Sequence, residues 1–87
     1  MIILVIAHMD KLKFDTEIYD TIRKNIRKYR KQCRMTSAQL AELVGLSHDF
    51  IRQIESTKAR YNFSVETFYK ISVVLGVTLD QLIEKSD

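Results

Sequence analysis

The sequence predicts an all-α domain built from five short helices. The chain of 87 residues contains no proline and only two glycines, which argues against a turn-rich β fold. Apolar residues recur at helical spacings of three and four along most of the chain. Both glycines fall inside similar pentapeptides, LVGLS and VLGVT, each of which can end one helix and begin the next. We therefore expect helices joined by tight links in one domain over residues 15–87.

The first predicted helix begins at Asp15 or Thr16, either of which can cap a helix N-terminus. An apolar stripe follows at intervals of four, four, three and four residues. Its members are Ile18, Ile22, Ile26, Tyr29 and Cys33. The opposite face is expected to be basic and solvated. Its members are Arg23, Lys24, Arg27, Lys28, Lys31 and Arg34.

The next two helices are predicted on either side of the first glycine. Thr36 and Gln39 fit a T-x-x-Q capping box, which opens the first of the two. Gly45 then ends it in a left-handed conformation that glycine adopts without steric cost. Ser47 caps the following helix. The residues expected to face inward from that helix are Ile51 and Ile54.

The last two helices follow a polar and basic stretch, STKARYNF, which is predicted to be a loop. Ser64 caps the fourth helix, and Gly76 ends it. A second T-x-x-Q box, from Thr78 to Gln81, opens a short fifth helix. The fourth-helix residues expected to point inward are Val65, Phe68, Ile71, and Val74 or Leu75.

An N-terminal extension, residues 1–14, begins with the apolar run MIILVIA. The run has no basic residue before it and is too short to span a bilayer, so neither a signal peptide nor a membrane partner is expected. Three interpretations stay open. Its Ile and Val content favours a β-strand that pairs with the same strand of a second chain. Alternatively it forms an apolar strip over the helical core, or translation begins at Met9 and residues 1–8 are not native.

Positive charge is concentrated in the middle of the chain. The net charge is +3, but residues 23–60 alone carry a net +7, whereas residues 1–22 and 61–87 each carry a net −2. Such a distribution is typical of a surface that binds a polyanion.

The sequence offers no pattern of catalytic or metal-binding residues. The two histidines are isolated, and the adjacent residues Ser47, His48 and Asp49 cannot converge on one substrate as a triad does. The single cysteine, Cys33, excludes an internal disulfide and is compatible with the reducing cytoplasm, where we expect the protein. No enzymatic activity, cofactor or metal is expected.

Small and apolar residues around Gly45 follow a specific pattern. Ala41 is small where two helices must approach closely, and Gly45 makes the turn between them. The apolar positions of the pattern are Leu40, Val44, Leu46, Ile51 and Ile54. Together with the tail FSVETFYKISVVLGVTLDQLI, the pattern resembles the phage-repressor-like helix-turn-helix family, also called the Cro or XRE family, over about residues 22–84. The resemblance implies a lambda-repressor-like fold whose second and third helices form the helix-turn-helix.

The resemblance also implies an ion pair. Members of the family place an arginine of the first helix against a glutamate near the end of the recognition helix, and here these residues are Arg30 and Glu55. We expect a partly buried, bidentate pair. The alternative is two solvated charges that never meet.

A recognition helix reads base edges with side chains from its first turn and from the turn that follows. The expected base readers are His48, Asp49, Arg52 and Gln53. Surrounding residues would contact phosphates, which supplies affinity and register. The expected phosphate contacts are Thr36, Ser37, Ser47, Ser56, Lys58, Arg60, Tyr61, Asn62, Arg27 and Lys31. The alternative for each residue is an ordinary place on the polar face of a surface helix.

These features predict a small transcriptional regulator, a repressor, that binds double-stranded DNA at a pseudo-palindromic site as a homodimer. Its two recognition helices would enter successive major grooves about 34 Å apart. The alternative is an antitoxin, or another module of the same fold, that binds a toxin or other protein partner. Single-domain members of the family that the chain resembles include both kinds, so the sequence leaves this choice open.

Overall fold

The computed structural model describes residues 15–56 and 63–85, and helices are the only regular elements in these two ranges. They are α2 (Asp15–Gln32), α3 (Ser37–Val44), α4 (His48–Glu55), α5 (Val65–Leu75) and α6 (Leu79–Ile83). The predicted all-α fold of five helices is confirmed. The N-terminal extension, with its predicted strand, lies outside the described residues, and so do four expected phosphate contacts. These four are Lys58, Arg60, Tyr61 and Asn62.

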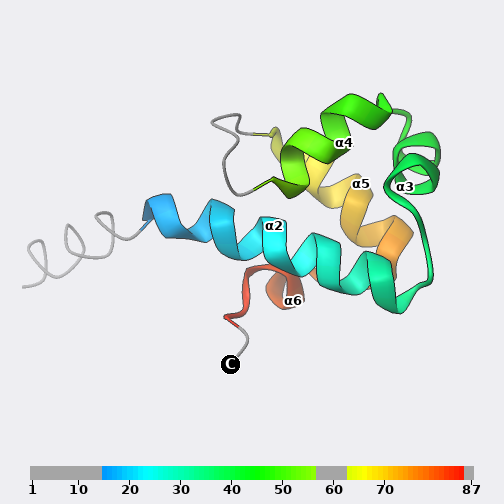
Figure 1. The fold of residues 1–87 in the computed structure, drawn as a ribbon. Coiled ribbons are helices and arrows are strands. Elements are labelled where there is room, and N and C mark those ends of the chain that lie inside the picture. Colours follow the sequence, from blue (N-terminus) through cyan, green and yellow to red (C-terminus); the bar gives the residue numbers. More distant parts are fainter. Residues whose placement is uncertain (1–14, 57–62, 86–87) are drawn as a thin grey trace, which may run out of the picture.

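The long helix α2 runs across the molecule, with α4 on one side of it and α6 on the other (Figure 1). α3 packs against α4 and α5, so the helix-turn-helix formed by α3 and α4 is held between α2 and α5. Each of the five helices contributes at least one side chain to a shared core. The largest fully buried side chains are Ile26, Leu40, Ile51, Ile54, Ile71 and Leu82.

All the predicted N-caps from Thr36 onward are present. The Thr36 hydroxyl accepts a hydrogen bond from the Gln39 backbone N–H at 3.1 Å, and the Gln39 side chain accepts one from the Thr36 N–H at 2.8 Å. Thr78 and Gln81 form the same reciprocal box at the start of α6. A single serine caps each of α4 and α5. The helix starts are therefore set by local side-chain chemistry, as the sequence predicts.

Three helices end through a left-handed residue, at Arg34, Gly45 and Gly76, whose φ angles are 54°, 74° and 69°. In each case the next residue donates its N–H to a carbonyl five positions earlier, for example Leu46 to Ala41 at 2.9 Å. This is a Schellman motif. Both glycines were predicted to end their helices, Gly45 in a left-handed conformation. Arg34 was expected only to carry charge, and no glycine marks that turn in the sequence.

Replacing Gly45 with alanine is expected to lower the free energy of unfolding by about 1 kcal/mol while preserving the fold. The left-handed backbone is unfavourable for a residue with a Cβ, yet a Cβ at Gly45 would meet no atom within 4 Å. Urea titration measures the loss, and Gly76→Ala is the matched control because its φ and its open surroundings are alike. A loss more than twice as large at Gly45 alone would contradict a purely local origin.

Two residues were assigned to the wrong face. Arg23 was predicted to be solvated, but it is 4% exposed, donates to Asp20 Oδ1 at 3.3 Å and lies 5.9 Å from the ring centroid of Tyr19. Its guanidinium lies over the aromatic ring of Tyr19, which is the geometry of a cation–π contact. Val65, predicted to point inward, is 78% exposed. It shares a helical face with the buried Ser72 but lies in the first turn of α5, at the margin of the packed region.

The apolar stripe of α2 is buried only at its centre. Ile22 and Ile26 belong to the core, and Tyr29 packs partly against it. Ile18 is 37% exposed, and Cys33, which follows the last residue of α2, is exposed. The sequence pattern therefore located the stripe correctly but overestimated its length.

Asn25 is a buried polar residue that joins α2 to α6. Its Nδ2 donates to the carbonyl oxygens of Leu82 at 2.7 Å and Glu84 at 2.8 Å, with a longer contact of 3.4 Å to that of Gln81. Carbonyls at the end of a helix have no N–H partner within the helix itself. Asn25 therefore caps the C-terminal end of α6 from a neighbouring helix.

Candidate nucleic-acid interface

Helix α4 presents to solvent all four side chains that were expected to read bases. They are His48, Asp49, Arg52 and Gln53. The opposite side of α4 buries Ile51 and Ile54 in the core, and Phe50 is half-buried against the same core. Packing of the apolar residues therefore decides which side chains of this helix face outward.

The ion pair expected between Arg30 and Glu55 is present and joins α2 to the end of α4. Arg30 Nε donates to Glu55 Oε2 at 2.6 Å, and Nη2 donates to Oε1 at 2.8 Å. The third nitrogen of the guanidinium, Nη1, donates to the Met35 carbonyl at 2.7 Å. The two side chains are only 12% and 9% exposed, so the pair is largely shielded from water.

A shallow hollow beside α4 gathers expected DNA contacts from three helices. Its lining residues are Arg27, Arg30, Ser37, Arg52, Glu55 and Ser56. Glu55 neutralises Arg30, whereas neither Arg27 nor Arg52 forms an ion pair with any residue in the described part of the chain. The hollow therefore carries an excess of positive charge, which attracts an anion.

A contact that the sequence did not reveal joins two of the expected DNA contacts to each other. Ser37 Oγ lies 2.9 Å from His48 Nε2, and the donor depends on the tautomer of the imidazole. The two residues begin α3 and α4, so the bond ties together the N-terminal ends of the helix-turn-helix. Each residue had been assigned a separate role, and only the three-dimensional arrangement pairs them.

The remaining expected phosphate contacts in the described residues lie outside the hollow. The Thr36 and Ser47 hydroxyls accept backbone N–H bonds from their own helices, and each keeps its O–H to donate elsewhere. Both residues are exposed, as is Lys31 in the last turn of α2. These three residues fall between the hollow-lining residues in the sequence, but they do not line the hollow themselves.

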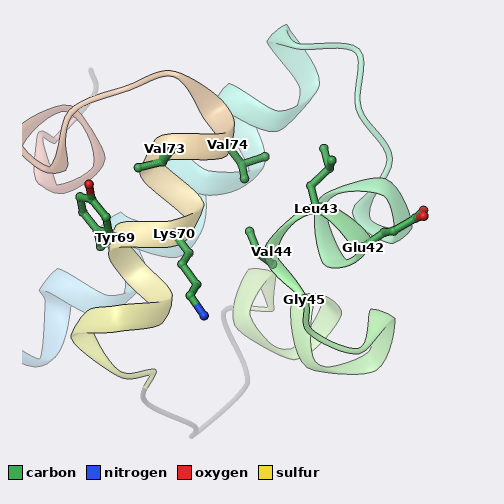
Figure 2. Close-up of a pocket in the computed structure, with 8 residues that line it drawn as sticks. All are labelled: Glu42, Leu43, Val44, Gly45, Tyr69, Lys70, Val73 and Val74. Atoms are coloured by element: carbon green, nitrogen blue, oxygen red, sulfur yellow. The ribbon is translucent and has the colours of Figure 1, made fainter.

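A second concave surface, the α3–α5 groove, has a different character. It is lined by Glu42, Leu43, Val44, Gly45, Tyr69, Lys70, Val73 and Val74. Figure 2 shows Val44 and Val74 pointing toward one another across the groove, whereas Glu42 and Tyr69 point away from it. Leu43, Tyr69 and Val73 remain more than half exposed. This surface is therefore apolar and accessible, unlike the basic hollow.

Other kinds of site are not apparent in the part of the chain that the structure describes. There, no three His, Cys, Asp or Glu side chains cluster so that they could hold a metal ion. In the same residues, no helix is both long enough and apolar enough to cross a bilayer.

Comparison with known proteins bears on the same segment of the chain. A family model described as helix-turn-helix matches residues 26–82, which is more than half of the chain. The immunity repressor protein of Bacillus phage phi105 is 32% identical to the chain over 63 residues. The alignment covers 72% of this chain and 42% of the phage protein, so the chain spans less than half the length of that relative.

Proposed function

The chain belongs to the phage-repressor-like helix-turn-helix family of DNA-binding transcription regulators, and on this basis we propose that it is a repressor that binds a pseudo-palindromic DNA site as a homodimer. The observation that carries the proposal is the arrangement of α4, with its polar side chains exposed beside a basic hollow. The name of the phage phi105 relative, an immunity repressor protein, supports repression as the sign of regulation.

In this proposal α4 enters the major groove of duplex DNA and presents hydrogen-bonding side chains to base edges. The Gln53 amide suits the donor and acceptor pair of adenine, and the Asp49 carboxylate suits the amino group of cytosine. The exposed hydroxyls of Thr36 and Ser47 would hold neighbouring phosphates and so fix the register of α4 on the DNA. Lys31 would add attraction that does not depend on sequence.

Dimerisation follows from the short site that one recognition helix can read. A twofold dimer doubles that site and places two α4 helices about one helical turn of DNA apart. The exposed apolar side chains of α6 offer one surface for it, since Leu79 and Ile83 are each more than one third exposed. The N-terminal extension, which lies outside the described residues, is the other surface that the sequence suggests.

Selection of bound fragments from the source genome, near physiological salt, tests the proposal directly. We expect enrichment of a pseudo-palindrome whose half-sites lie about one helical turn apart. Sedimentation of the complex with that site should give two chains per duplex. Recovery of sequence-random DNA alone, with binding that disappears as salt rises, would refute a sequence-specific regulator.

Gln53→Ala is expected to relax base preference at one position of each half-site by about 1–3 kcal/mol, while binding to non-specific DNA stays nearly unchanged. The reason is that a base contact carries sequence information and a phosphate contact does not. Competition binding with a set of single-base operator variants measures the effect. Gln32→Ala, the same substitution at an exposed position at the end of α2, is the control. Equal weakening on every sequence would remove Gln53 from base readout.

A second proposed function is binding of a partner protein, such as a toxin, and the α3–α5 groove is the observation that favours it. Contiguous exposed apolar side chains on a small domain commonly mark a protein contact. An amphipathic segment would fit, with an apolar stripe against Leu43 and Val73 and opposite charges near Glu42 and Lys70. This candidate becomes the leading one if genomic selection yields no specific site.

A further inference from the structure

The four exposed polar side chains of α4 fall into two rows that face different surroundings. Residues four apart lie above one another on a helix, so His48 shares a row with Arg52, and Asp49 shares a row with Gln53. On the side of α4 that carries the first row, neighbouring helices are bonded at two positions. His48 contacts Ser37 of α3, and Glu55, one turn beyond Arg52, is paired with α2.

Arg52 lies between these two anchored positions and lines the basic hollow. Arg27, on α2, lines the same hollow and adds a second guanidinium to it. Neither of these arginines is neutralised by a described residue, because Glu55 is occupied by Arg30. Two arginine side chains therefore line the hollow between α2, α3 and α4, and no described carboxylate is available there to neutralise them.

A phosphodiester is the anion that this arrangement fits. Its single negative charge is matched by two guanidinium groups, whose planar forks pair well with phosphate oxygens. Ser37 lines the same hollow and opens α3, so the first N–H groups of that helix favour an anion there. By contrast, Asp49 and Gln53 form the row that neither neighbouring helix engages in the described structure.

We infer that Arg52 grips a DNA backbone phosphate together with Arg27, instead of reading a base, and that Asp49 and Gln53 are the principal base readers. The inference rests on the proposed DNA-binding function and assigns different roles within it. The phosphate held in the hollow fixes the rotation of α4 in the major groove. The Asp49 and Gln53 row then meets the base edges.

The test compares Arg52→Gln with the wild-type chain on the selected operator and on non-specific duplex, over a range of salt concentrations. The slope of log affinity against log salt should fall by about 0.9 for each bound subunit. The ratio of specific to non-specific affinity should stay unchanged, and the preferred bases should be the same. Arg52→Lys should restore most of the slope because it keeps the charge.

A matched control removes one positive charge that lies outside the hollow, on α2. Lys24 is exposed on α2 and lines a different concavity, with Thr21 of α2 and with Lys85, which follows α6. Lys24→Gln should leave the salt slope unchanged. Thermal unfolding of each variant confirms that the fold is retained.

Neutral methylphosphonate groups, placed one at a time along the operator, identify the phosphate. At one position in each half-site the substitution should weaken wild-type binding and leave Arg52→Gln and Arg27→Gln binding almost unaffected. The inference would be overturned if, at every operator position, the affinity lost through methylphosphonate simply added to the affinity lost through Arg52→Gln or Arg27→Gln. So would a relaxed base preference in Arg52→Gln with an unchanged salt slope.

Inorganic phosphate added without DNA separates a backbone site from a site for a free anion. We expect no saturable binding at millimolar concentrations when amide chemical shifts are followed. Saturable binding that Arg52→Gln abolishes, together with a featureless methylphosphonate scan, would overturn the assignment to DNA. A failure of the proposed function itself would be visible earlier, because the wild-type chain would select no operator.

Discussion

Replacing Glu55 with alanine is expected to lower the free energy of unfolding by about 3 kcal/mol, because it leaves the Arg30 guanidinium largely buried without its carboxylate. The paired side chains are only 12% and 9% exposed, and both oxygens of Glu55 accept hydrogen bonds. The remaining bond from Arg30 to the Met35 carbonyl does not balance the charge. Urea titration followed by circular dichroism measures the change.

The molecule contains its own control for this prediction. Lys70 and Glu66 also form an ion pair, at 3.1 Å, but their side chains are 52% and 75% exposed. Glu66→Ala should therefore cost no more than about 0.5 kcal/mol, as for other exposed pairs of this spacing. Similar losses for Glu55→Ala and Glu66→Ala would show that burial does not set the strength of the Arg30–Glu55 pair.

A double substitution separates the strength of the pair from the penalty of breaking it. Replacing both Arg30 and Glu55 with methionine removes the buried charge altogether, so it should cost less than Glu55→Ala alone. The single variants for comparison are Arg30→Met and Glu55→Met. If the stability lost by the double variant equals the sum of the losses in these two, the residues are not coupled and the prediction is wrong.

Local chemistry explains why the helix boundaries of this protein could be predicted from sequence. A capping threonine such as Thr36 and a left-handed glycine such as Gly45 satisfy backbone groups within a few residues, so their signals are complete in a short stretch. The end of α2 was harder to predict because Arg34 adopts the left-handed conformation without being glycine. There the turn is imposed on a residue whose type does not indicate it.

Long-range polar contacts could not be predicted in the same way. The burial of Asn25 depends on three carbonyls more than fifty residues away. The burial of Arg23 was missed because Arg23 was assigned to the basic face opposite the apolar stripe. The resemblance to the family did identify the Arg30–Glu55 pair, which spacing alone would not have done. The hollow that gathers Arg27 and Arg52 also emerges only when α2 and α4 are placed together.

Asn25→Ala is expected to lower the free energy of unfolding by about 2 kcal/mol, since the buried Leu82 carbonyl and the partly buried Glu84 carbonyl lose their donor. Asn25 is 2% exposed, and its two short hydrogen bonds go to the Leu82 and Glu84 carbonyls. Asn25→Asp should lose more, because a carboxylate has no N–H and would face carbonyl oxygens. The neighbouring Lys24→Ala, on exposed surface, should be nearly neutral.

In Asn25→Ala, structure should be lost first in α6, because that helix has only five residues and its end depends on a hydrogen-bond donor from α2. Hydrogen exchange should therefore accelerate first at the amides of α6, before those of the helix-turn-helix. If Leu79 and Ile83 form the dimer contact that we propose, Asn25→Ala should also weaken dimerisation while each monomer keeps the fold of α3 and α4. Uniform acceleration across all helices would instead show that Asn25 stabilises the domain as a whole and does not act locally on α6.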